Sequence, residues 1–169
     1  MELNLPIFQV EIALGNFLIS GNFQPRGDAM VYMNDQSRTH IRVDDVELKT
    51  LTSDYQIPGF KQSYMSLDRD GIHFISIINQ EQAELLQVLR TKRPVVFYTD
   101  WCAIRGDLHV NRDLRDDDLL DRGHDYFAIS NASVFSTKAV AKLPTRSVSY
   151  VLVNRRKVLA YHSYHPDEA

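Results

Sequence analysis

Apolar and polar residues alternate along several short stretches of the chain, which is the pattern of half-buried β-strands. In the first such stretch, apolar residues occupy alternate positions on each side of a Gly-Asn pair at 15 and 16: Val10, Ile12, Leu14, Phe17 and Ile19. A short Gly-Asn turn between two alternating runs predicts a β-hairpin. Similar runs predict further strands, at 39–50, 63–68, 71–78, 125–137, 148–154 and 157–164.

The same pattern occurs twice, at a spacing of about 86 residues. Tyr64–Arg69 aligns with Tyr150–Arg155, and Gly21 aligns with Gly106 at a spacing of 85. In both copies the apolar residues switch from one set of alternate positions to the other in the middle of a strand. The switch falls at Asp44-Asp45 in the first copy and at Ser130-Asn131 in the second. Such a change predicts a β-bulge, and a glycine inside a strand predicts a sharp bend. We therefore interpret residues 1–79 and 80–169 as two copies of one unit.

One segment has the composition of a helix. Residues 80–91 contain good helix formers and an apolar stripe of Leu85, Leu86 and Leu89, after Asn79 as N-cap and before Pro94. The fold predicted from these patterns is mainly β. It consists of two tandem five-stranded SH3-like barrels, joined by a short α-helix over 80–91.

The first copy resembles the Sm and Sm-like (LSm-type) family. The resemblance lies in the apolar alternation of residues 10–14, in Gly21 within the bent second strand, and in Met33-Asn34 before the third. The segments 64–77 and 150–163 resemble the second motif of that family. The resemblance implies small Sm-like barrels that self-associate through strand edges. RNA-binding members carry Arg-Gly in the closing turn, where this chain has Asp68-Arg69 and Asn154-Arg155.

Composition and charge indicate which classes of protein the chain can belong to. The chain has 169 residues, 44% hydrophobic and 24% charged, with a net charge of −3. Residues 1–79 hold 6 basic and 10 acidic side chains, and residues 80–169 hold 13 and 12. Neither balance is that of a strongly basic nucleic-acid binder. No apolar run is long enough for a membrane span, and a single cysteine, Cys102, favours a cytoplasmic location.

Candidate chemical sites are few. The aspartates between 113 and 121 lack the order of a calcium loop. His162 and His165 lie three apart on a predicted strand, so their side chains point to opposite faces. Cys102 aligns with apolar Phe17, which indicates a buried packing thiol. We predict no catalytic residue, no metal site and no cofactor, and hence no enzymatic activity.

Basic residues of the second copy are the candidate nucleic-acid contacts. They lie in the predicted loop 138–146 and in the closing turn: Lys138, Lys142, Arg146, Arg155, Arg156 and Lys157. A strand of roughly 20 Å separates the two groups. The sequence thus predicts a non-enzymatic cytoplasmic binding or assembly module that acts through a protein partner or self-association. The alternative is a weak RNA-binding protein that uses these basic loops.

Overall fold

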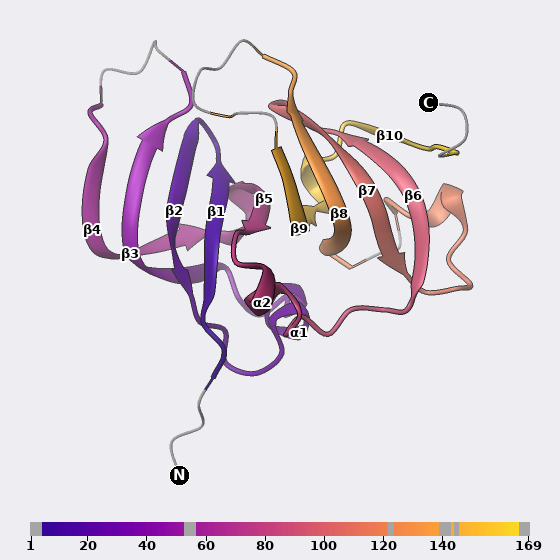
Figure 1. Cartoon of the computed structure of the whole chain (residues 1–169), viewed down its shortest axis with the longest axis horizontal. Coiled ribbons are helices and arrows are strands. Elements are labelled where there is room, and N and C mark those ends of the chain that lie inside the picture. The colour runs from indigo at the N-terminus through magenta and orange to yellow at the C-terminus, as the bar shows by residue number, and fades with distance from the viewer. Residues whose placement is uncertain (1–4, 53–56, 122–123, 139–142, 144–145, 166–169) are drawn as a thin grey trace.

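A computed structural model describes residues 5–52, 57–121, 124–138, 143 and 146–165. The protein is mainly β, as the alternating pattern predicted. Its ten strands are all antiparallel and form one sheet in the order β10-β6-β7-β8-β9-β5-β1-β2-β3-β4 (Figure 1). Five strands come from each half of the chain.

The first half supplies the strands β1 (Phe8–Leu14), β2 (Phe17–Phe23), β3 (His40–Thr50), β4 (Phe60–Asp68) and β5 (Ile72–Ile77). The predicted hairpin at Gly15 is confirmed, because Phe17 pairs with Leu14 and Gly15 has a φ of 54°. A short helix α1 (Ala29–Asn34) lies between β2 and β3, and a 3-10 turn η1 (Arg69–Gly71) joins β4 to β5.

The second half begins with α2 (Gln80–Ala83). It continues with β6 (Thr91–Tyr98), β7 (Cys102–Val110), η2 (Asp116–Asp118), β8 (Tyr126–Ser136), β9 (Arg146–Asn154), η3 (Arg155–Lys157) and β10 (Ala160–Ser163). The strand predicted over 157–164 is shorter in the structure, because η3 extends through Lys157 and β10 begins only at Ala160.

Strand pairing in the second half follows that of the first half residue by residue. All eight residue pairs between β3 and β4 recur between β8 and β9, 86 residues later. The four pairs that β10 makes with β6 recur in the pairing of β5 with β1. The two sets of five strands therefore have the same internal order and register.

The predicted bulges lie where the apolar parity changes. Asp45 and Asn131 have φ values of 51° and 49°, and the register shifts beside each of them. The shift brings β3 against Gly21, where an added Cβ would lie 2.6 Å from a Val43 methyl carbon. Gly106 is equally crowded by β8. Glycine is therefore required at both positions by close backbone approach.

The predicted pair of separate barrels is not what the structure has. β5 pairs with β9, so the two sets of strands join into a single open sheet. Every residue of β5 is buried. Its side chains are divided between two cores, since Ile75 and Ile77 pack in the core of the first set and Phe74 packs in that of the second. Pairing with β9 covers an apolar edge that would otherwise face water.

The predicted helix 80–91 is wrong over most of its length. Helix α2 begins after Asn79, whose side chain accepts a hydrogen bond from the Gln82 amide, but it ends at Ala83. Leu85 and Leu89 are exposed, and only Leu86 of the expected apolar stripe is buried. β6 begins at Thr91, which pairs with Val110 of β7, so the last residue of the predicted helix belongs to the sheet.

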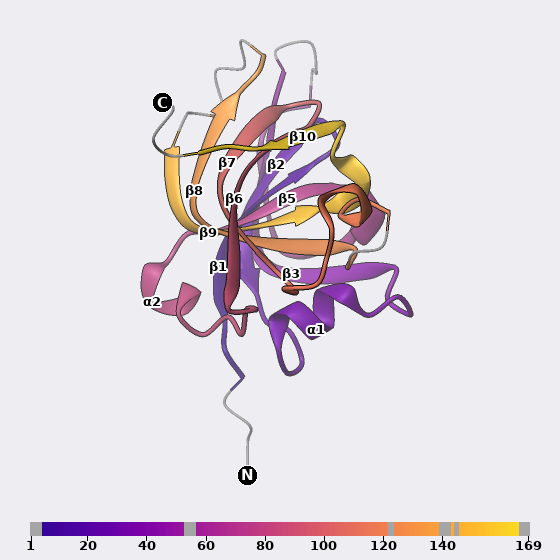
Figure 2. The ribbon, with the colours of Figure 1, turned by 90° about the vertical axis from the view of Figure 1, so that its right-hand side faces the viewer.

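Both short helices lie in the lower part of the molecule in Figures 1 and 2, and the second view shows them on different sides of β1. No helix in the described ranges is long and apolar enough to cross a membrane.

Candidate functional site

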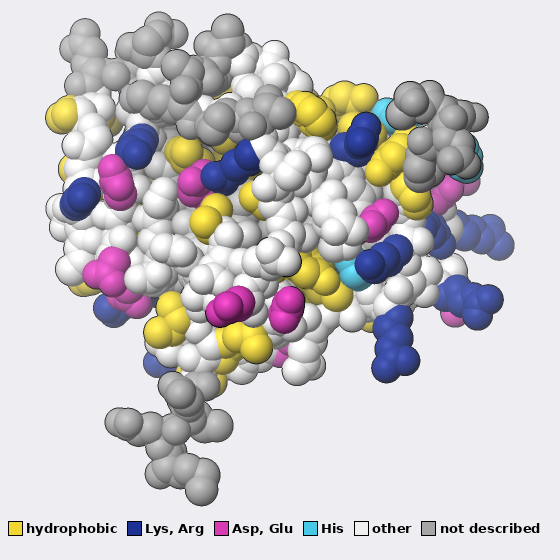
Figure 3. All heavy atoms as spheres, in the orientation of Figure 1, with side chains coloured by type: hydrophobic (Ala, Val, Ile, Leu, Met, Phe, Trp, Pro, Cys, Tyr) yellow, Lys and Arg dark blue, Asp and Glu magenta, His cyan; other side chains and the backbone are white. Residues whose placement is uncertain are grey.

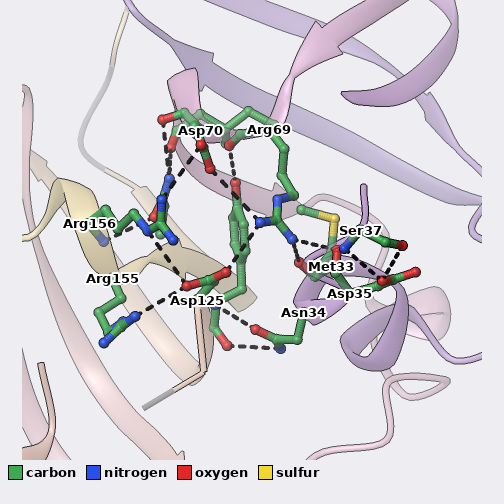
Figure 4. A network of polar contacts seen from close by, with 12 residues as sticks. Met33, Asn34, Asp35, Ser37, Arg69, Asp70, Asp125, Arg155 and Arg156 are labelled. Atoms are coloured by element: carbon green, nitrogen blue, oxygen red, sulfur yellow. Dashed lines mark hydrogen bonds and ion pairs between the residues drawn. The ribbon is translucent and has the colours of Figure 1, made fainter. Parts of the chain in front are cut away.

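The line where the two sets of strands meet carries a cluster of charged side chains, which we call the junction network. It consists of Arg69 and Asp70 from η1, Asp125 just before β8, and Arg155 and Arg156 from η3 (Figure 4). The turns η1 and η3 close the two sets at equivalent positions. The β5–β9 pairing brings them to the same end of the junction.

Asp125 is the centre of this network. Its side chain is only 4% exposed, and one carboxylate oxygen lies 3.2 Å from the guanidinium of Arg69. The other oxygen lies 3.2 Å from Arg155 and 3.7 Å from Arg156. Arg156 also reaches Asp70 across the junction, at 3.6 Å. One buried carboxylate thus links a guanidinium of the first set to two of the second.

Arg69 is buried and fixed in place by the backbone. It donates hydrogen bonds to the carbonyl oxygens of Met33 (3.2 Å) and Asp35 (2.8 Å) at the end of α1. Its Nε is buried without a partner among the described residues. The residue therefore ties α1, η1 and the second set together.

Hydrogen bonds between uncharged groups also join the two sets of strands beside the junction network. The Asn34 side chain accepts from the Tyr126 amide (2.8 Å) and donates to the Tyr126 carbonyl (3.3 Å), as a neighbouring strand would. The Tyr126 hydroxyl donates to the Arg69 carbonyl at 2.7 Å. Burial raises the pKa of this phenol, so it stays a hydrogen-bond donor at neutral pH. Asn34, which belongs to the Met33-Asn34 pair noted in the sequence, therefore makes contacts within the chain.

The predicted nucleic-acid contacts that the structure describes lie in two groups, one near each end of β9, as expected. Lys138 is exposed and lies over the Trp101 ring at 4.2 Å, and Lys157 is half-buried. Lys142 lies outside the described residues. Arg146 donates to Glu11 across the junction at 3.0 Å. Arg155 and Arg156 belong to the junction network, so three of the six predicted residues have carboxylate partners inside the chain.

A different group of basic residues is unpaired. Arg90, Lys92, Arg112 and Arg115 are exposed, and none forms an ion pair within the described part of the chain. They lie at the start of β6 and just beyond β7, where Figure 3 shows Lys and Arg side chains projecting from one end of the molecule. Two hollows of about 680 and 690 Å³ adjoin them. We call this the basic end. Because Asp113 and Asp116–Asp118 interleave with these residues, sequence counting alone did not single them out.

The two ends of the sheet are open edges. Among the described strands, β4 pairs only with β3 and β10 only with β6. Figure 1 places β4 and β10 on opposite sides of the molecule. Large apolar side chains are exposed at both edges: Phe60 and Tyr64 on β4, and Tyr98 and Leu159 beside β10. The edges were predicted only as general features of small barrels, since the strand order depends on the β5–β9 pairing.

The other residues considered as chemical candidates are buried or contact neighbouring side chains. Cys102 is fully buried, as its alignment with Phe17 predicted, and burial raises the pKa of its thiol to about 11. His162 contacts the Tyr98 hydroxyl at 3.1 Å. Asp116 pairs with Arg93 at 2.9 Å. Within the described ranges, no group of three or more His, Cys, Asp or Glu side chains is placed to hold a metal ion.

One buried pair resembles a catalytic dyad and was not found from the sequence. His109 Nδ1 lies 2.6 Å from the Leu89 carbonyl, so Nδ1 must donate and Nε2 must accept from the Ser130 hydroxyl at 2.8 Å. Both side chains are about 5% exposed, and neither lines any of the four described hollows. The pair anchors the segment before β6 to β7 and β8.

Comparison of the chain with protein-family models, with curated proteins and with solved structures found no match.

Proposed function

We propose that this chain is a non-enzymatic binding and assembly module that acts through the two open edges of its sheet. The observation that carries the proposal is the β5–β9 pairing, in which one set of strands already binds the other by strand addition. Among the strands that the structure describes, β4 and β10 each keep one such edge without a partner. Unpaired strand edges with exposed apolar side chains favour binding of another strand.

The repeated strand register supports a duplicated, Sm-like origin. The two sets have the same order of five strands, with a crowded glycine and a bulge at matching positions. We propose that each set derives from one Sm-like unit, opened so that β5 pairs with β9, and that the protein acts in the cytoplasm. Fold resemblance does not determine the ligand, so the function rests on the edges themselves.

The test uses a lysine on one edge. Tyr64→Lys places a charge on β4 opposite Asp44, so the variant is expected to fold, while lysine on an edge opposes strand addition. Val31→Lys on α1 is the matched control, because Val31 is 71% exposed and away from both edges. We expect any association, seen as mass in solution or as a partner captured from lysate, to be lost in Tyr64→Lys only. A chain that neither self-associates nor captures a partner through this edge would refute the proposal.

The second candidate function is weak RNA binding, and one observation favours it. The basic end offers four cations that form no ion pair with any described residue, whereas Arg146, Arg155 and Arg156 are already paired. We propose that phosphates are contacted there, with salt-dependent affinity. Fluorescence anisotropy with labelled single-stranded RNA would compare an Arg112→Glu/Arg115→Glu variant with Arg155→Ala. Binding that depends on Arg155, or that is unaffected by salt, would exclude the basic end.

A further inference from the structure

We propose that this protein binds a small cation with an apolar body, in a hollow between α1, the segment that precedes β6, and β8. The hollow has a volume of about 290 Å³. Its lining comes from the segment 28–34, from 87–89, and from positions 124 and 128, so both halves of the chain contribute. None of these residues belongs to β4 or β10, and the proposal is therefore independent of the open edges.

The hollow exists because α1 lies beside β8. The Asn34 side chain at the end of α1 exchanges two hydrogen bonds with the Tyr126 backbone, at 2.8 and 3.3 Å, which holds the helix next to the start of β8. Two residues further along β8, Ala128 is only 2% exposed and lines the hollow with a single methyl group. Its counterpart 86 positions earlier is Arg42, which has a long side chain. The small side chain at position 128 thus leaves room between α1 and β8.

Most of the lining is apolar. Met30 and Val88 are half-buried and pack against the core of the first set, while Val31 and Leu89 are exposed. Apolar walls of this kind favour a ligand with an apolar body, because its burial removes apolar surface from water. A cavity of about 150 Å³ is enough to hold benzene, so this hollow has room for one ring and a short chain.

One carboxylate sets the charge of the hollow. Asp28 is half-buried, and its Oδ1 accepts a hydrogen bond from the Val31 amide at 2.8 Å. It forms no ion pair with any described residue, and the described lining contains no lysine or arginine. The other polar side chains there are Asn34, which is already bonded to β8, Gln87 and His124. Because a hydrogen bond from an ammonium group to a carboxylate is charge-assisted, the hollow favours a cation over a neutral molecule or an anion.

The test uses 2-phenylethylamine, which carries an ammonium group at neutral pH, and its uncharged analogue 2-phenylethanol. Each compound is titrated into the isotope-labelled full chain while the amide chemical shifts are recorded by NMR. With the amine, we expect saturable shifts at residues 28–34, 87–89 and 128. The alcohol should bind at least about tenfold more weakly, since it lacks the charge-assisted hydrogen bond. Equal affinity for the two compounds would overturn the proposal.

Asp28→Asn removes the charge and keeps the start of α1, because asparagine caps helices as well as aspartate does. We expect this variant to bind the amine about tenfold more weakly and to bind the alcohol as the wild-type protein does. Glu84→Gln is the matched control, because Glu84 is an exposed carboxylate that does not line the hollow. It should bind both compounds with wild-type affinity.

Thermal unfolding gives a second measurement. A compound that binds only the folded state raises the unfolding midpoint. At a fixed concentration, the amine should therefore raise the midpoint of the wild-type protein and of Glu84→Gln by the same amount, and that of Asp28→Asn by less. Chemical shifts that never saturate, that map to other residues, or that are unchanged in Asp28→Asn would overturn the proposal. The proposed function is tested separately, since Tyr64→Lys changes β4 and leaves the lining of the hollow intact.

Discussion

Replacing Asp125 by alanine should destabilise the whole protein. The substitution removes the only carboxylate within reach of Arg155 and the nearest one to Arg69 among the described residues. Taking one partner from a buried ion pair costs about 3–5 kcal/mol, because the other charge stays buried without compensation. Arg69 keeps its bonds to two carbonyls and Arg155 is 17% exposed, so we expect the lower end, about 3 kcal/mol.

The assay is urea unfolding followed by circular dichroism and by Trp101 fluorescence. A domain of this kind has a stability of about 5–15 kcal/mol, so the expected loss is a large and measurable fraction of the total. Because β5 and β9 contribute to both cores, we expect the two signals to report one shared transition. Asp125→Ala should lower the urea concentration at the midpoint of unfolding and leave the dependence of the unfolding free energy on urea concentration unchanged.

Asp113→Ala is the matched control, since Asp113 is exposed and has no ion pair within the described ranges. It should change stability by less than about 0.5 kcal/mol. The reasoning about the junction network is refuted if Asp125→Ala is as mild as this control. Two separate transitions in the wild-type protein would refute the shared cores.

Three further predictions concern substitutions at other residues. Gly21→Ala should cost about 1–3 kcal/mol, measured by thermal unfolding, because its Cβ would lie 2.6 Å from a Val43 methyl carbon. Burial lowers the pKa of His109, so the unfolded state takes up the proton first and stability should fall as the pH drops below about 6.5. In His109→Gln, the unfolding midpoint should depend less steeply on pH than it does in the wild-type protein. Asp70→Arg and Arg156→Asp should each lower the free energy of unfolding by about 1 kcal/mol, as expected for an exposed ion pair, and the double variant should recover most of that loss in urea unfolding.

The strands were predictable because their signal is local. Alternation of apolar residues gave the strands within a few residues, and the parity change at Asp44-Asp45 located a bulge. The hydrogen bond of Asn79 at the start of α2 was also predicted from a local preference. Helix α1 was not predicted, although Asp28 caps it by accepting from the Val31 amide. Six residues are too few for a clear helical period.

The joining of the two sets could not be predicted from local patterns. Residues of β5 and β9 that pair are more than 70 positions apart, and an apolar strand such as Ile72–Ile77 is equally consistent with a barrel core. The same difficulty affected the candidate site. Arg155 and Arg156 are basic residues in a turn, which the sequence presents as free cations. Their carboxylate partner, Asp125, lies 30 residues before Arg155 in the sequence. It contacts Arg69 only because the two sets of strands join.

The shared junction has a consequence for synthesis of the protein on the ribosome. β5 ends at Ile77, and its partner β9 begins at Arg146, 69 residues later. At about 5–20 residues per second, the partner strand emerges roughly 3–14 seconds after β5. During that interval a strand whose residues are all buried in the folded protein has no native neighbour on one side. Nascent chains translated close together on one messenger are therefore the form of this protein most exposed to mispairing, and the one most in need of a chaperone.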